Sequence, residues 1–94
     1  MGKKQKFLQG LTESLNLPAE TLAGITVAEV WGDGRVLVEN HSGIISYGQQ
    51  EILIGASYGM LKVSGEGLKV TMMTGEQLIL SGTIGNLEIM GKRL

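Results

Sequence analysis

The chain has 94 residues, a formal net charge of −1 and no cysteine. This length fits one small domain, and without thiols the chain has neither disulfides nor thiolate metal sites to stabilise it. Nothing resembles a signal peptide, and no apolar run approaches the roughly 20 residues that span a bilayer, so the sequence predicts a soluble, cytoplasmic protein without an integral membrane segment.

The charges are distributed unevenly. Basic residues gather at the two ends of the chain, at Lys3, Lys4, Lys6, Lys92 and Arg93. Between positions 7 and 91, three basic residues stand against nine acidic ones, a net charge of −6. Because phosphate contacts dominate the affinity of proteins for nucleic acids, this acidic body argues against a nucleic-acid partner.

Residues 1–18 are predicted to form a basic amphipathic helix that ends at a Leu-Pro break. Phe7, Leu11 and Leu15 recur at a spacing of four and give one apolar stripe. So short a helix is not stable alone and must dock on its own domain, on a neighbouring subunit or on a membrane. For the membrane alternative, the candidate surface contacts are Lys3, Lys4, Lys6 and Phe7.

Residues 19–94 are predicted to form a single β domain of about eight short strands. Each strand is rich in Val, Ile and Leu and is bounded by glycine or other turn residues. The predicted strands are Ile25–Trp31, Arg35–Glu39, Gly43–Tyr47, Glu51–Ile54, Met60–Ser64, Leu68–Met73, Gln77–Ser81 and Asn86–Met90. Gly32-Asp33-Gly34 is a strong hairpin signal between the first two. Less specific turn signals are Ser57-Tyr58-Gly59, Gly65-Glu66-Gly67 and Thr74-Gly75-Glu76.

The pattern is compatible with two arrangements of these strands. A weak Leu-x-aliphatic-x-Gly repeat, as in Leu61–Gly65 and Leu78–Gly82, leaves a short β-solenoid as an alternative. A solenoid should show a sharper fixed period, so we expect a small rolled or sandwiched, mostly antiparallel sheet with the helix over one open face or end. Several strands, such as Ile52-Leu53-Ile54, are apolar on both faces, which favours self-association through β edges or apolar faces.

The stretch Asn40-His41-Ser42-Gly43 lies between two apolar runs and suits a type I turn, so it is predicted to be a hairpin. His41 and Asp33 are the only residues of their types. No spacing places a serine against this histidine, no Asp-rich calcium loop exists and the glycine pairs do not precede a helix. We therefore expect no enzyme activity, no catalytic residue, no metal site and no cofactor.

Aromatic residues give an alternative function. Trp31 and Tyr47 could line the mouth of a rolled sheet, which would make the protein a small-ligand or peptide-binding module.

Three glycine-punctuated segments carry a family resemblance. These are Val38-Glu39-Asn40-His41-Ser42-Gly43-Ile44, Gly59–Leu68 and Leu78–Ile84. Together with Leu17-Pro18 after a basic start, they resemble the YabP/YqfC family of sporulation proteins, with the YqfC branch the better match. The chain departs from the family pattern at Ser42, where arginine is frequent, and at Leu22-Ala23-Gly24, where a second Leu-Pro is frequent.

The resemblance implies a non-enzymatic structural or scaffolding protein of endospore formation. It would be made in the mother cell and would act at the forespore membrane through a membrane-protein partner resembling YqfD. The family carries no catalytic residues to transfer. The candidate partner contacts are Glu39, Asn40, His41, Trp31 and Tyr47.

Overall fold

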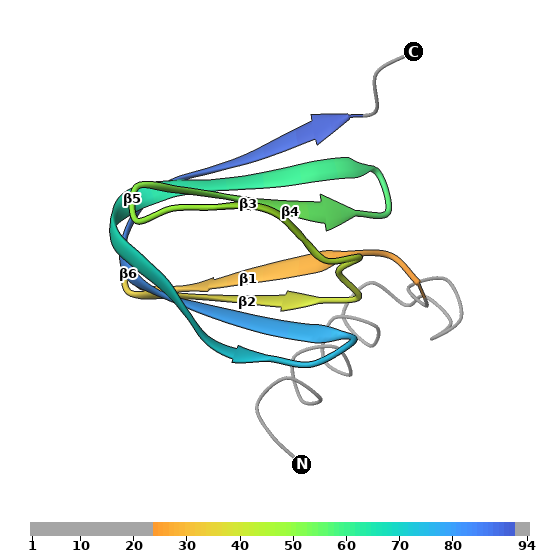
Figure 1. The fold of residues 1–94 in the computed structure, drawn as a ribbon, viewed down its shortest axis with the longest axis horizontal. Coiled ribbons are helices and arrows are strands. Elements are labelled where there is room, and N and C mark those ends of the chain that lie inside the picture. The colour runs from red at the N-terminus through yellow and green to blue at the C-terminus, as the bar shows by residue number, and fades with distance from the viewer. Residues whose placement is uncertain (1–23, 92–94) are drawn as a thin grey trace.

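The computed structural model describes residues 24–91, which fold into one open antiparallel sheet of six strands (Figure 1). The strands are β1 (Val27–Trp31), β2 (Arg35–Glu39), β3 (Ile44–Tyr47), β4 (Glu51–Ala56), β5 (Gly59–Met73) and β6 (Gln77–Gly91). Their order in the sheet is β1-β2-β6-β5-β4-β3. The all-β class and the antiparallel pairing predicted from the sequence are confirmed, while the predicted helix and the Leu-Pro break lie outside the described residues.

Two long strands bend and thereby fold the sheet over on itself. β5 and β6 have 15 residues each, and β2 pairs only with the first part of β6, from Gln77 to Ser81. β4 pairs only with the first part of β5, from Gly59 to Ser64. One half of the sheet therefore contains β1, β2 and the hairpin end of β5 and β6, and the other contains β3, β4 and their opposite ends. Figure 1 shows the two halves facing each other across the bend.

Glycines permit this bend because the backbones approach closely there. The β5–β6 register shifts between Ser64 and Gly65 and again between Glu66 and Lys69. A Cβ on Gly65 would overlap the carbonyl of Thr83, and one on Gly82 would lie 2.7 Å from the Gly67 carbonyl oxygen. Gly82 also has φ 136°, which a side chain would strain. Each glycine thus marks a bulge inside a strand and not the end of one.

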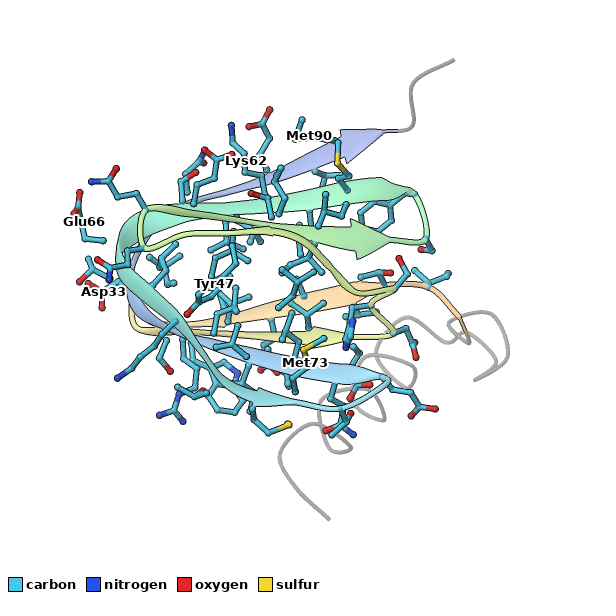
Figure 2. All side chains as sticks on the ribbon, in the orientation of Figure 1. Asp33, Tyr47, Lys62, Glu66, Met73 and Met90 are labelled. Carbon is cyan, nitrogen blue, oxygen red and sulfur yellow. The ribbon has the colours of Figure 1, made fainter. Side chains whose placement is uncertain are left out.

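The core lies between the two halves, where Figure 2 shows side chains filling the space. It consists of Val36, Val38, Ile52, Ile54, Leu61, Val63, Leu68, Leu78 and Leu80, each at most 1% exposed. Alternate residues of β2, β4, β5 and β6 supply this cluster, since side chains along a strand point to opposite faces. The prediction that some strands are buried on both faces is confirmed for β2. Its Leu37 points to the opposite face from Val36 and Val38, and it is only 3% exposed.

Two fold predictions were wrong. The chain has six described strands and not eight, because Met60–Ser64 with Leu68–Met73, and Gln77–Ser81 with Asn86–Met90, are each one bent strand. The solenoid alternative is wrong because every neighbouring pair of strands is antiparallel. The predicted turns at Gly32–Gly34 and Thr74–Glu76 are confirmed as hairpin connections, closed by bonds from Gly34 N to Trp31 O (3.3 Å) and from Thr74 N to Gln77 O (2.8 Å).

The bend predicts a large difference between two glycine substitutions. Gly65→Ala should lower the free energy of unfolding by about 1–3 kcal/mol, because the new methyl group meets backbone that cannot move aside. Gly75→Ala is the control, since a Cβ there meets nothing within 4 Å, and should change it by less than about 0.5 kcal/mol. Urea unfolding followed by circular dichroism measures both, and equal stabilities would contradict this account of the bend.

Candidate functional site

The segment from Asn40 to Gly43 connects the two halves of the folded sheet. β2 pairs with β1 and β6, whereas β3 pairs with β4, so the segment crosses between halves. The predicted hairpin at this position is therefore wrong. The predicted type I turn is wrong too, because the N–H of Gly43 bonds to the ring of His41 and the carbonyl of Asn40 accepts from Thr26. The partners of the flanking strands are set by their apolar faces, which lie in different halves. We call residues 40–43 the crossover.

Asn40 begins the crossover in the left-handed region, with φ 62°, which asparagine tolerates better than most residues. Its N–H donates to Glu76 O at 2.6 Å, and its side-chain Nδ2 donates to Ile25 O at 3.0 Å. Its carbonyl accepts the hydroxyl proton of Thr26 at 2.8 Å. One residue thus joins the crossover to the entry of β1 and to the β5–β6 turn.

His41 follows and is only 8% exposed. Its Nδ1 accepts a hydrogen bond from the N–H of Gly43 at 2.9 Å, and its Nε2 lies 2.8 Å from the carbonyl oxygen of Thr74. A carbonyl can only accept, so Nε2 carries the proton and Nδ1 is the acceptor. The two contacts together hold the neutral tautomer with hydrogen on Nε2, and both ring nitrogens are used by backbone groups.

The crossover then joins β4. Ser42 N donates to Gly55 O at 3.0 Å, and Gly55 N donates to Gly43 O at 2.8 Å. Gly43 has φ 114°, a conformation that glycine adopts without steric strain. A Cβ on Gly55 would meet the Ser42 hydroxyl, which would have to rotate away, while the backbone atoms of Ser42 and Gly43 lie at ordinary contact distance.

A second set of hydrogen bonds ties β1 to the β4–β5 turn. Thr26 N donates to Ser57 Oγ at 3.0 Å, and Ser57 N donates to Thr26 Oγ1 at 2.8 Å. Thr26 is 3% exposed, and its hydroxyl also reaches Asn40. Next to this pair, partial burial raises the pKa of Tyr58 above its ordinary value of 10.0, so the phenol stays neutral near pH 7.

Sequence reasoning missed Thr26, Ser57, Gly55 and Thr74 as members of this network. Thr26 and Ser57 are 31 positions apart, and each is a common residue in a stretch without a distinctive motif. Only the packing of the two sheet halves brings them together. The glycines at positions 43 and 55 are compatible with close backbone packing, but the sequence does not show which residues they pack against.

The predicted partner contacts differ in their exposure to solvent. Glu39 is 4% exposed and His41 8%, so both are largely removed from the surface. Tyr47 is 56% exposed. It pairs with the core residue Ile52 and so points to the inner side of the sheet, between the two halves in Figure 2.

Trp31 lies in the other half of the sheet and on its outer side. It pairs with Arg35, and Arg35 points outward because the next residue along the strand, Val36, points into the core. The guanidinium of Arg35 lies 5.8 Å from the centre of its ring. The structure therefore does not bring Trp31 and Tyr47 to one shared mouth. Lys3, Lys4, Lys6 and Phe7 lie outside the described residues.

Between residues 24 and 91 no group of three or more His, Asp or Glu side chains could hold a metal ion. The same part of the chain contains no helix long and apolar enough to cross a membrane.

The fold and the crossover define a class of small β protein in which the distinctive polar residues hold two halves of one bent sheet together. The chain belongs to the YabP family, which matches residues 26–94. It is similar to a protein of Bacillus subtilis (strain 168) named "Uncharacterized protein YqfC", with 23% identity over 82 residues, covering 87% of this chain and 88% of the relative. No solved structure matches the chain.

The crossover predicts that His41 is needed for stability. His41→Ala should lower the free energy of unfolding by about 2–4 kcal/mol, because it leaves Gly43 N–H and Thr74 O without their partner. Ser42→Ala, one residue away on an exposed side chain, is the control and should change stability by less than about 0.5 kcal/mol. Chemical denaturation of both variants checks the pair, and a neutral His41→Ala would show that the imidazole is dispensable.

The Thr26–Ser57 pair predicts energetic coupling. Thr26→Val keeps the side-chain shape, but its methyl group can neither accept from Ser57 N nor donate to Asn40 O, at an expected cost of about 1–3 kcal/mol. Ser57→Ala removes the acceptor for Thr26 N. In a double-mutant cycle, the combined loss should differ from the sum of the single losses by at least about 0.5 kcal/mol. Strict additivity in denaturant unfolding would refute the coupling.

Proposed function

We propose that the protein is a non-enzymatic structural protein of endospore formation. It acts in the cytoplasm of the mother cell, on the mother-cell side of the forespore membrane, together with a membrane-protein partner resembling YqfD. It also associates with itself through β edges or apolar faces.

One observation supports the non-enzymatic part more than any other. His41, the single histidine of the chain, uses both ring nitrogens to hold backbone groups at the crossover. A general base needs a nitrogen within reach of a substrate proton, and here neither nitrogen is available without breaking the fold. The residue with the most suitable chemistry for catalysis near pH 7 is thus committed to structure.

Family membership supports the cellular role. The match to the YabP family covers most of the described domain, and the likeness to YqfC extends over nearly the whole chain. The crossover with its Glu-Asn-His-x-Gly-Ile segment lies within the matched residues. The expectation of a membrane-protein partner comes from the resemblance to the YqfC branch.

The structure supports a choice among the candidate partner contacts. Tyr47 and its neighbour Ile45 are each 56% exposed on β3, at one end of the sheet. An exposed aromatic beside an exposed aliphatic residue is the kind of pair that anchors protein interfaces. We therefore assign the partner contact to β3 in preference to the buried Glu39 and His41.

A genetic experiment tests this role. Deleting the gene should sharply reduce the yield of heat-resistant spores, and the wild-type gene supplied elsewhere should restore it. Co-purification from sporulating cells should recover a membrane protein with the wild-type chain but much less of it with Tyr47→Asp. Met73→Asp, a matched change at a 50% exposed apolar residue on β5, should retain the partner. Normal sporulation after deletion, in a strain without a second family member, would refute the proposal.

A further inference from the structure

The last part of β6 has a free edge. β2 ends its pairing with β6 at Ser81, and the β1–β2 turn adds only two further bonds, from Gly82 N to Gly34 O at 3.3 Å and from Ile84 N to Asp33 O at 2.6 Å. Beyond this point, within the described residues 24–91, β6 is paired with β5 alone. We call residues 84–91 the β6 arm. In Figure 1 it is the outermost strand of its half of the sheet.

Other margins of the folded sheet are better protected against pairing. Native proteins blunt such edges with short strands, bulges and charged residues. β1 has only five residues, and β3 has four with a register shift between Ile44 and Ser46. The unpaired side of β5 near its hairpin end carries Lys69 and a register shift between Val70 and Met72. In the β6 arm the register shift falls only at the start, at Gly85, and the pairing with β5 is uninterrupted from Asn86 to Gly91.

The side chains of the β6 arm suit an apolar contact. Ile89 is 67% exposed, the largest exposure among the large hydrophobic residues of the described chain, while Leu87 packs partly against the core. Both face the inner side, since they pair with Leu61 and Val63. The single charge, on Glu88, lies 3.8 Å from the amine of Lys62 on the neighbouring strand, so the arm carries no unbalanced charge.

We propose that the β6 arm pairs in antiparallel orientation with the β6 arm of a second copy of this chain. This inference rests on the proposed structural role and names the surface of self-association. The second copy is the occupant that the arm fits best. Antiparallel pairing centred on Leu87 places Glu88 opposite Asn86 and Ile89 opposite Gly85, so no like charges oppose each other and equal lengths of free edge are paired.

The geometry also sets the size of the assembly. Pairing of an edge with its own copy about a two-fold axis is isologous and uses the free edge of both subunits, so it closes at a dimer. One added strand pair buries less area than a standard interface of about 1,600 Å². The dimer is therefore expected to be weak, with a dissociation constant on the order of micromolar.

Sedimentation equilibrium of the full chain tests the proposal between about 1 µM and 1 mM, a range that brackets the expected affinity. The wild-type protein should change from monomer to dimer with concentration. Ile89→Lys should weaken the dimer at least about tenfold, because a lysine on a free edge opposes strand pairing. Val30→Lys, at an exposed residue on β1 in the other half of the sheet, should dimerise as the wild type does. Both residues are exposed, and circular dichroism of each variant checks that the fold is retained.

Hydrogen exchange gives a second readout on the wild-type protein. Amide protection within the β6 arm should rise with protein concentration while protection within β3 stays constant. A monomer at every concentration would overturn the proposal, and so would a dimer that Val30→Lys dissociates and Ile89→Lys does not. A monomeric wild-type protein whose deletion still abolishes spore formation would refute self-pairing and leave the structural role standing.

Discussion

The fold depends on the close approach of the β5 and β6 backbones at the bend, where there is room for glycine but not for a residue with a Cβ. At the bend, Gly65 on β5 lies against the carbonyl of Thr83, and Gly82 on β6 lies against the carbonyl of Gly67. Because both long strands give way at the same level, they stay paired on either side of the bend. The apolar residues of β2 and β4, which belong to different halves, then meet across one core.

The polar residues at the crossover help to hold the two halves of the sheet together. Bending alone would leave the two halves free to splay. The crossover joins them at the open end, because Asn40 and His41 bond to the β5–β6 turn of one half while Ser42 and Gly43 bond to Gly55 on β4 of the other. Thr26 and Ser57 make a second such connection. Side chains that would attract attention as catalytic candidates are therefore explained by the backbone groups they satisfy, as buried donors and acceptors require.

Local signals in the sequence predicted most of the elements and little of their assembly. Aliphatic runs and the Asp33-Gly34 and Thr74–Glu76 turns located the strand segments and two hairpins, because these depend on neighbours in the chain, but the number of strands was wrong. Gly65–Gly67 was interpreted as a turn, since a bulge and a turn have the same local requirement for glycine. The prediction of a hairpin at Asn40–Gly43 was wrong for a similar reason, because turn residues also suit a connection between strands that do not pair with each other. The partners of His41 could not be predicted, because Thr74 reaches it only after the sheet has folded over.

The continuity of β5 and β6 through both halves determines how the domain comes apart. In a sandwich of two separate sheets, one layer can loosen while the other persists. Here the same two strands contribute to both layers, so removing one half of the core unpairs residues that support the other half. Residues 24–91 therefore form one cooperative unit with no internal boundary at which a stable fragment could separate.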